Sequence, residues 1–277
     1  MGSLKPRLIS VLVFVSLFAL ASPAPADDVQ DCSDSIVLVK TDPGRAFAAC
    51  SSLAERGNAI AQLNLGSMYY KGEGAPQDYN DSLKWYRAAA DQGLAEAEYA
   101  VGVIYARGQG VPPDLVEAQK WLHKAAIQQH PAAQYLLGSM YLDGEGVTRD
   151  SDEAVKWLRM AGDKGFAPAQ YLLGTMYQHG LGVAKDYHEA EKWYRSAADK
   201  GFVLAQLELG RMYHEGIGIA MNYTEAMRIY RQAADQGSAT AQYLIGSIFL
   251  RGDGVKKDYA EAAMMPLWMK VKRIAIE

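Results

Sequence analysis

The sequence lacks a surplus of basic residues, a long apolar run and a rich supply of cysteine. Its 277 residues carry 28 Lys and Arg against 32 Asp and Glu, which gives a formal net charge of −4. Nucleic-acid binding normally depends on clustered Lys and Arg, and no such cluster occurs, so we expect no nucleic-acid partner. Hydrophobic residues make up 49% of the chain, which excludes a disordered protein.

The sequence signatures of common enzymes are also missing. The chain has no G-x-S-x-G elbow, no P-loop, no H-E-x-x-H motif and no G-x-G-x-x-G motif. Its 5 histidines show no spacing that is typical of a metal site. We therefore predict a protein that is not an enzyme and that holds no metal ion and no cofactor.

The apolar run at residues 8–21 is short for a membrane span, which needs about 20 apolar residues. Lys5 and Arg7 precede the run and Ala24-Pro25-Ala26 follows it, as in a secretory signal peptide with an A-x-A cleavage site. We predict that residues 1–26 are a signal peptide; cleavage after Ala21 and an uncleaved anchor are the alternatives. The mature protein is then exported without a membrane span, to the periplasm or the medium, or to the lumen of the endoplasmic reticulum in a eukaryote.

The chain has 2 cysteines, Cys32 and Cys50, which both lie near the predicted mature N-terminus. An oxidising compartment favours a disulfide between them over two buried thiols. A loop of this size would stabilise the fold by about 3 kcal/mol in the chain-entropy model.

What the sequence does contain is a repeat of 36 residues. A glycine recurs at this period, an aromatic residue follows it by three positions, and a G-x-G pair comes next. A period of this length is typical of stacked repeats. The recurring glycines are Gly66, Gly102, Gly138, Gly174, Gly210 and Gly246.

Each repeat predicts two helices joined by the glycine turn. In the third copy, residues 133–142 carry apolar side chains at i, i+4 and i+8, which predicts the first helix. Gly138 lies inside it, at a cost of about 1 kcal/mol relative to alanine, so we expect a close approach of the partner helix. Asp150 is expected to cap the second helix and to form a capping box with Glu153.

The pattern A-x-x-x-L-G-x-x-Y-x-x-G-x-G-V-x-x-D-x-x-x-A-x-x-W-Y-x-x-A-A-x-x-G resembles the Sel-one-like repeat, a relative of the tetratricopeptide repeat. The match is clearest at residues 133–165 and 169–201. The resemblance implies an all-α fold, a right-handed α-solenoid of stacked helical hairpins with 36-residue repeats. It also implies that the first helix of each hairpin lines the concave side.

Four segments are predicted along the chain. Residues 1–26 are the signal peptide, and residues 27–57 form a degenerate N-terminal repeat or cap that contains the cysteine pair. Residues 58–262 form a solenoid of six copies, of which the last is incomplete. Residues 263–277 form an atypical C-terminal cap or tail, because Pro266 should interrupt the last helix. The alternative for this tail is that Leu267 and Trp268 contact a partner or a second copy of the chain.

Stacked hairpins produce an extended concave surface, which is where repeat proteins bind their partners. The first-helix positions that vary most between copies form three columns, and we predict that they line this groove. The alternative is that they are merely solvated. The predicted groove residues are Asn64, Lys71, Arg107, Asp143, His179, Glu208, Arg211, Glu215 and Arg251.

Within these columns Asp143, His179 and Glu215 occupy equivalent places in consecutive repeats. Zinc ligands need bonds of about 2.0–2.2 Å, and side chains on separate helices meet that requirement only with favourable rotamers. We therefore favour a negative strip that receives a basic segment of a partner over a metal site.

The predicted function is that of an exported scaffold or adaptor that binds another protein in its groove, as a periplasmic regulatory or assembly factor. The alternative is a secreted hydrolase or binder of β-lactams or cell-wall peptides, an activity associated with cysteine-rich members of the family that this chain resembles. Those members carry a cysteine pair in each repeat, whereas this chain has one pair outside the regular repeats.

Overall fold

The computed structural model describes residues 26–33 and 38–262 of the chain. Residues 1–25 of the predicted signal peptide and the whole predicted tail, residues 263–277, lie outside this part. The described residues contain no strand, and no helix among them is long and apolar enough to cross a membrane. The helices are α1 (Ala26–Ser33), α3 (Pro43–Glu55), α4 (Ala59–Lys71), α5 (Tyr79–Ala90), α6 (Ala95–Arg107), α7 (Leu115–Ile127), α8 (Pro131–Asp143), α9 (Ser151–Asp163), α10 (Ala167–His179), α11 (Tyr187–Ala198), α12 (Val203–Glu215), α13 (Tyr223–Asp235), α14 (Ala239–Arg251) and α15 (Tyr259–Ala262).

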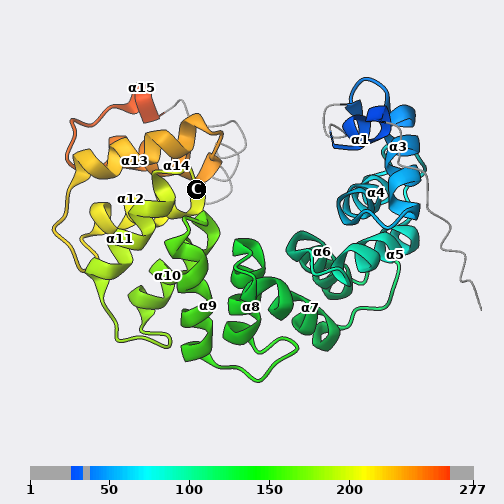
Figure 1. Cartoon of the computed structure of the whole chain (residues 1–277). Helices are drawn as coiled ribbons and strands as arrows, with labels where there is room; N and C mark the ends of the chain where they lie inside the picture. Colours follow the sequence, from blue (N-terminus) through cyan, green and yellow to red (C-terminus); the bar gives the residue numbers. More distant parts are fainter. Residues whose placement is uncertain (1–25, 34–37, 263–277) are drawn as a thin grey trace, which may run out of the picture.

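These helices follow one another along an open arc, with α3 and α4 in one arm and α13 and α14 in the other (Figure 1). From α3 onwards each helix packs against the helix before it and the helix after it in the chain. The small residues that recur every 36 positions, such as Ala97, Ala133 and Ala169, are completely buried between these helices. The predicted all-α solenoid of stacked hairpins is confirmed.

The glycine turn ends the first helix of each hairpin as predicted. In the third hairpin α8 ends at Gly144, which has a left-handed backbone with φ of 76° and donates its N–H to the carbonyl of Met140. A side chain at this φ would be strained, so glycine is the residue that closes the helix with least strain. The helix itself is slightly longer than predicted, because Pro131 is accommodated in its first turn.

The second helix is capped as predicted, but only half of the capping box forms. The Asp150 carboxylate accepts hydrogen bonds from the N–H groups of Asp152 and Glu153, at 3.0 and 2.9 Å. The prediction that Glu153 bonds back to the cap is wrong, because the N–H of Asp150 already donates to the carbonyl of Tyr141, at 2.9 Å. The Glu153 carboxylate instead pairs with Lys156 at 2.8 Å.

In the first five hairpins the glycine inside the first helix lies directly against the second helix of the same hairpin. A Cβ atom on Gly138 would lie 2.7 Å from Leu158, and one on Gly174 would lie 2.6 Å from the ring of Tyr194. Both distances are shorter than carbon atoms tolerate. The predicted close approach is confirmed, and it explains why glycine stands at a position where alanine would favour the helix.

A buried amide column, which the sequence analysis missed, joins successive hairpins. The Gln134 side chain is fully buried and donates to the carbonyl of Ala126, at the end of the preceding helix, at 3.0 Å. Gln62, Gln170 and Gln206 make the equivalent bond. In the second hairpin the place of the glutamine is taken by Glu98, which is 4% exposed and accepts a hydrogen bond from the Gln128 amide at 2.7 Å.

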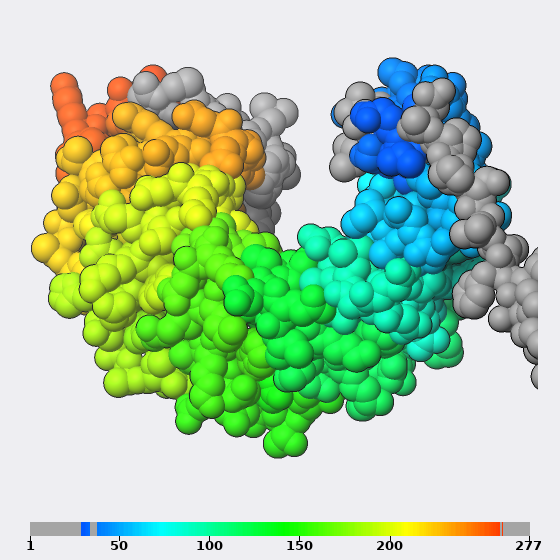
Figure 2. Space-filling model, viewed as in Figure 1, coloured from blue at the N-terminus to red at the C-terminus, as the bar shows by residue number. Residues whose placement is uncertain are grey.

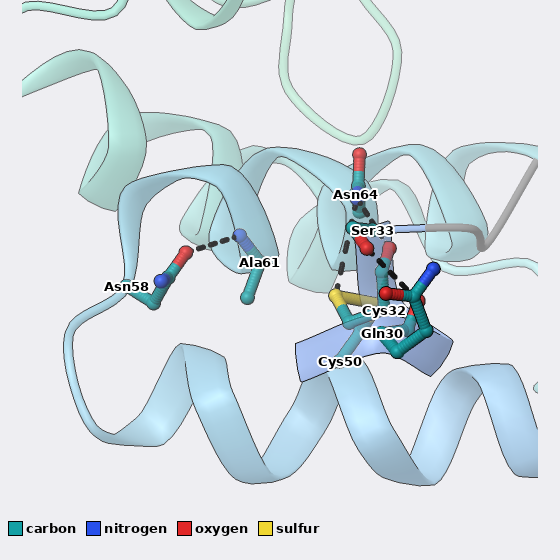
Figure 3. The surroundings of a disulfide bond; sticks show 7 residues. All are labelled: Gln30, Cys32, Ser33, Cys50, Asn58, Ala61 and Asn64. Carbon is teal, nitrogen blue, oxygen red and sulfur yellow. Dashed lines mark hydrogen bonds between the residues drawn. A yellow bond between two sulfur atoms is a disulfide. The ribbon is translucent and has the colours of Figure 1, made fainter. Parts of the chain in front are cut away.

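The N-terminal end of the arc is held together by the disulfide between Cys32 of α1 and Cys50 of α3 (Figure 3). Both cysteines are buried in one apolar cluster with Leu53 and Leu65. Asn64 of α4 lies over the disulfide and donates to the carbonyl of Cys32 at 2.9 Å. This bond ties the first helix of the first hairpin to α1.

Candidate binding groove

The inside of the arc is hollowed between the two arms (Figure 2). The even-numbered helices from α4 to α14 line this side, and the odd-numbered helices from α5 to α13 form the outside (Figure 1). Eight positions of α8 are at least partly exposed, and six of them fall within a sector of about 120° around the helix axis. These positions are Ala132, Tyr135, Leu136, Ser139, Leu142 and Asp143, and we call them and their equivalents in the other even-numbered helices the inner face.

All of the predicted groove residues lie on the inner face, in three of its six columns. The last residue of each even-numbered helix is exposed and precedes the left-handed glycine, so these residues form a row along one rim. The rim residues are Lys71, Arg107, Asp143, His179, Glu215 and Arg251.

The other predicted groove residues are already engaged within the chain. The Asn64 amide braces α1, as described above. On α12 the Arg211 guanidinium lies 2.6 Å from the Glu208 carboxylate and 3.6 Å from that of Glu215. Partial burial acts to lower the pKa of Arg211, but the hydrogen bond to Glu208 and the charges of Glu208 and Glu215 together hold that pKa above the usual value.

Three further columns of the inner face were missed by the sequence prediction, and the one that contains Tyr135 varies little between the copies. One of them carries Tyr99, Tyr135 and Tyr171 at equivalent places in α6, α8 and α10. Each ring contacts the residue that precedes the next even-numbered helix, and the Tyr135 and Phe166 ring centroids are 5.5 Å apart. The 36-residue recurrence of tyrosine was the signal that could have identified this column.

The floor of the groove between α6 and α10 is formed mainly by uncharged side chains. In α8 the floor consists of Tyr135, Leu136, Ser139 and Leu142 between the exposed ends of the helix. Equivalent places in α6 and α10 carry tyrosine, alanine, valine, leucine, threonine and glutamine. The charged side chains therefore lie at the rim, at Glu96 near the start of α6 and at α12, while an apolar and aromatic strip with a few polar groups runs between them.

His130 is a titratable group at the edge of this strip. Its Nδ1 atom accepts a hydrogen bond from the N–H of Ala133, at 3.2 Å, and so caps α8. The ring stacks on Tyr99 with the centroids 4.7 Å apart, and its Nε2 atom lies 3.9 Å from the Glu96 carboxylate. Burial lowers the pKa of His130, and the nearby Glu96 only partly opposes this effect.

No group of three His, Cys, Asp or Glu side chains within the described residues is arranged to hold a metal ion. Asp143, His179 and Glu215 stand at the ends of three successive inner helices, and they contribute to the rim row as separate side chains. The geometry is that of an extended concave surface.

Comparison with known proteins gives one family. Residues 59–94, 95–130, 131–166, 167–202, 203–238 and 239–265 each match the model of the Sel1 repeat. A search of curated proteins finds no match.

Two solved structures are similar over most of this chain. A protective antigen of uropathogenic Escherichia coli strains, which displays an SLR fold, is 32% identical with a TM-score of 0.78. The alignment covers 91% of this chain but 54% of the antigen, so this chain spans about half of that protein. A Sel1 repeat protein from Oxalobacter formigenes is 31% identical with a TM-score of 0.76, and the alignment covers 87% of this chain and 95% of that one.

Proposed function

Because this chain belongs to the Sel1 repeat family, whose members generally mediate protein–protein interaction and are typically not catalytic, we propose that it is an exported scaffold that binds another protein in its concave groove. Its role is that of a periplasmic regulatory or assembly factor.

One observation carries the proposal. The inner face is built from six equivalent helices whose buried positions repeat, while its exposed positions differ from one hairpin to the next. A constant framework with variable side chains on its concave side is how repeat proteins present an extended binding surface. The tyrosines of the floor support the same function, since tyrosine is enriched at protein interfaces.

Export is supported by two features of the N-terminal region. The sequence of residues 1–26 has the order of charged, apolar and A-x-A segments found in signal peptides. The Cys32–Cys50 disulfide is the kind of bond that persists in an oxidising compartment. The alternative activity, on β-lactams or cell-wall peptides, has no observation in its favour, since the cysteine pair precedes the first matched repeat.

The experiment is an affinity pull-down from the native envelope fraction with three forms of the protein. The test variant replaces the rim residues Asp143, His179 and Glu215 with alanine. The control variant replaces Lys84, Lys120 and Lys156 with alanine, since these exposed residues lie on the odd-numbered helices outside the arc.

We expect a partner that binds the wild type and the control variant but not the rim variant. A partner that binds all three forms equally would show that the groove is not the binding surface. Far-UV circular dichroism of the three forms checks that the fold is intact.

A further inference from the structure

The charge of the rim changes sign along the groove. At the α4 and α6 end the rim residues are Lys71 and Arg107, whereas α8 and α12 end in Asp143 and Glu215. All four side chains are exposed, so they can meet a partner in the groove. A partner that fits this surface must carry complementary charges along its length.

The basic end is reinforced by residues from the preceding segment. Lys40 lines the same 180 Å³ pocket as Lys71, together with Asn64 and Ser67. The acidic group at this pocket is Glu73, whose carboxylate is 3.8 Å from the Lys71 ammonium. The rim at the α4 and α6 end therefore carries three cationic side chains, Lys40, Lys71 and Arg107, against the carboxylate of Glu73, and its charge balance is positive.

Arg107 is held in position for this role. Its guanidinium donates to the Tyr70 hydroxyl at 3.3 Å, and that hydroxyl donates in turn to the Gln109 side chain at 2.8 Å. Among the described residues no carboxylate lies within 4 Å of the Arg107 side chain. The positive charge is thus oriented by neutral groups, which leave it available to an acidic partner.

The opposite balance holds at α8 and α12. The exposed Asp143 and Glu145 side chains flank the left-handed glycine at the end of α8. On α12 the Arg211 guanidinium is shared between Glu208 and Glu215, so two carboxylates face one cation. Between the two ends lies the uncharged floor formed by α6, α8 and α10.

We propose that the groove binds a polypeptide segment with charge polarity, in which acidic residues face α4 and α6, apolar residues cover the floor, and basic residues face α8 and α12. This inference rests on the proposed function and specifies the chemistry of the partner. The segment lies across the inner helices in one direction, because the reversed direction places like charges together at both ends.

The test is a selection from a library of random peptides of about 15 residues, which span about 50 Å when extended. The immobilised protein is the wild type, the charge-reversal variant Lys71→Glu with Arg107→Glu, or the control variant Lys84→Glu with Arg231→Glu. The control makes the same change of charge on helices α5 and α13, outside the arc.

We expect the wild type and the control to select peptides with acidic residues near one end and basic residues near the other. The charge-reversal variant should select basic residues at the first of these positions and bind the original peptides about tenfold more weakly, as expected for reversal of two rim charges.

Two outcomes would overturn the inference, and they are distinguishable. Peptides that bind the wild type without charge polarity, or whose consensus is the same with the charge-reversal variant, contradict the charge pattern and leave the groove as a binding surface. Failure of the folded wild type to select any consensus contradicts the proposed function itself.

Discussion

The replacement Glu98→Gln is expected to stabilise the protein, which is unusual for a substitution at a buried position. Glu98 occupies the place where four other hairpins carry a glutamine whose amide donates to a backbone carbonyl at 2.9–3.1 Å. An ionised carboxylate cannot donate this bond. Its other contact would survive the change, because Gln92 and Gln236 donate to Gln62 and Gln206 in the same way that Gln128 donates to Glu98.

The size of the effect follows from two contributions. A new hydrogen bond to the carbonyl of Ala90 should add about 0.5–1.5 kcal/mol to the free energy of unfolding. Burial also raises the pKa of Glu98, so the folded state disfavours the ionised form. A carboxyl whose pKa is higher in the folded state stabilises the fold below its unfolded pKa, and that stability is lost as pH rises through the folded pKa. The advantage of glutamine should therefore be larger at pH 7 than at pH 4.

The assay is urea unfolding of the wild type and Glu98→Gln at both pH values, with Glu145→Gln as the control for an exposed glutamate. The reverse change, Gln62→Glu in the first hairpin, should destabilise the protein and show the opposite pH trend. A lower stability of Glu98→Gln at pH 7, or the same gain at both pH values, would refute the reasoning.

Three further changes test other parts of the structure. His130→Asn should keep the cap of α8. Because burial lowers the pKa of His130 in the folded state, the free energy of unfolding of the wild type should fall as pH drops below about 6.5, whereas that of the variant should not. Urea unfolding of both forms measures this difference. Gly174→Ala should lower the free energy of unfolding by about 1–3 kcal/mol, since the new methyl group would overlap Tyr194. An unchanged free energy of unfolding would contradict the packing of α10 on α11. The double replacement Cys32→Ser with Cys50→Ser should lower the free energy of unfolding by up to about 3 kcal/mol. The reduced wild type is the control, and it should unfold at a similar urea concentration to the double variant.

The framework was predictable because six copies of one hairpin reveal which positions are constrained. A glycine that recurs inside a helix, such as Gly138, is unfavourable for the helix itself, so its recurrence indicated a packing contact before any contact was known. The end of each first helix was predictable for the same reason, since the glycine that closes it is required by its left-handed backbone.

The contacts between hairpins were not predictable from the pattern in the same way. Gln134 is polar and follows a buried alanine, and nothing in its own type shows that its amide reaches the carbonyl of Ala126 eight residues earlier. The prediction of a capping box failed because the N–H of Asp150 donates to the carbonyl of Tyr141 in the preceding helix. A local sequence motif carries no information about that contact. The tyrosine column of the inner face was not predicted, because the groove positions were chosen by their variation between the copies. Tyr99 and Tyr135 are the same residue at equivalent places.

The departures from the repeat gather at the interface between the second and third hairpins. Gln129 stands where the equivalent residue of the other hairpins is glycine, and its φ of 66° strains a residue that has a Cβ atom. Lys164 donates to both the carbonyl and the side chain of Gln129, each at 2.8 Å, and the bond to the carbonyl recurs between Lys200 and Gly165 at 2.7 Å. His130, which caps α8 and stacks on Tyr99 of α6, adds an ionisable side chain at this interface. The stability of a solenoid is approximately a sum over neighbouring interfaces, so substitutions at Gln129 or His130 should act mainly on this interface. This interface also separates the basic rim residue Arg107 from the acidic rim residue Asp143, so bending there would change the distance between the two charges that a partner has to match.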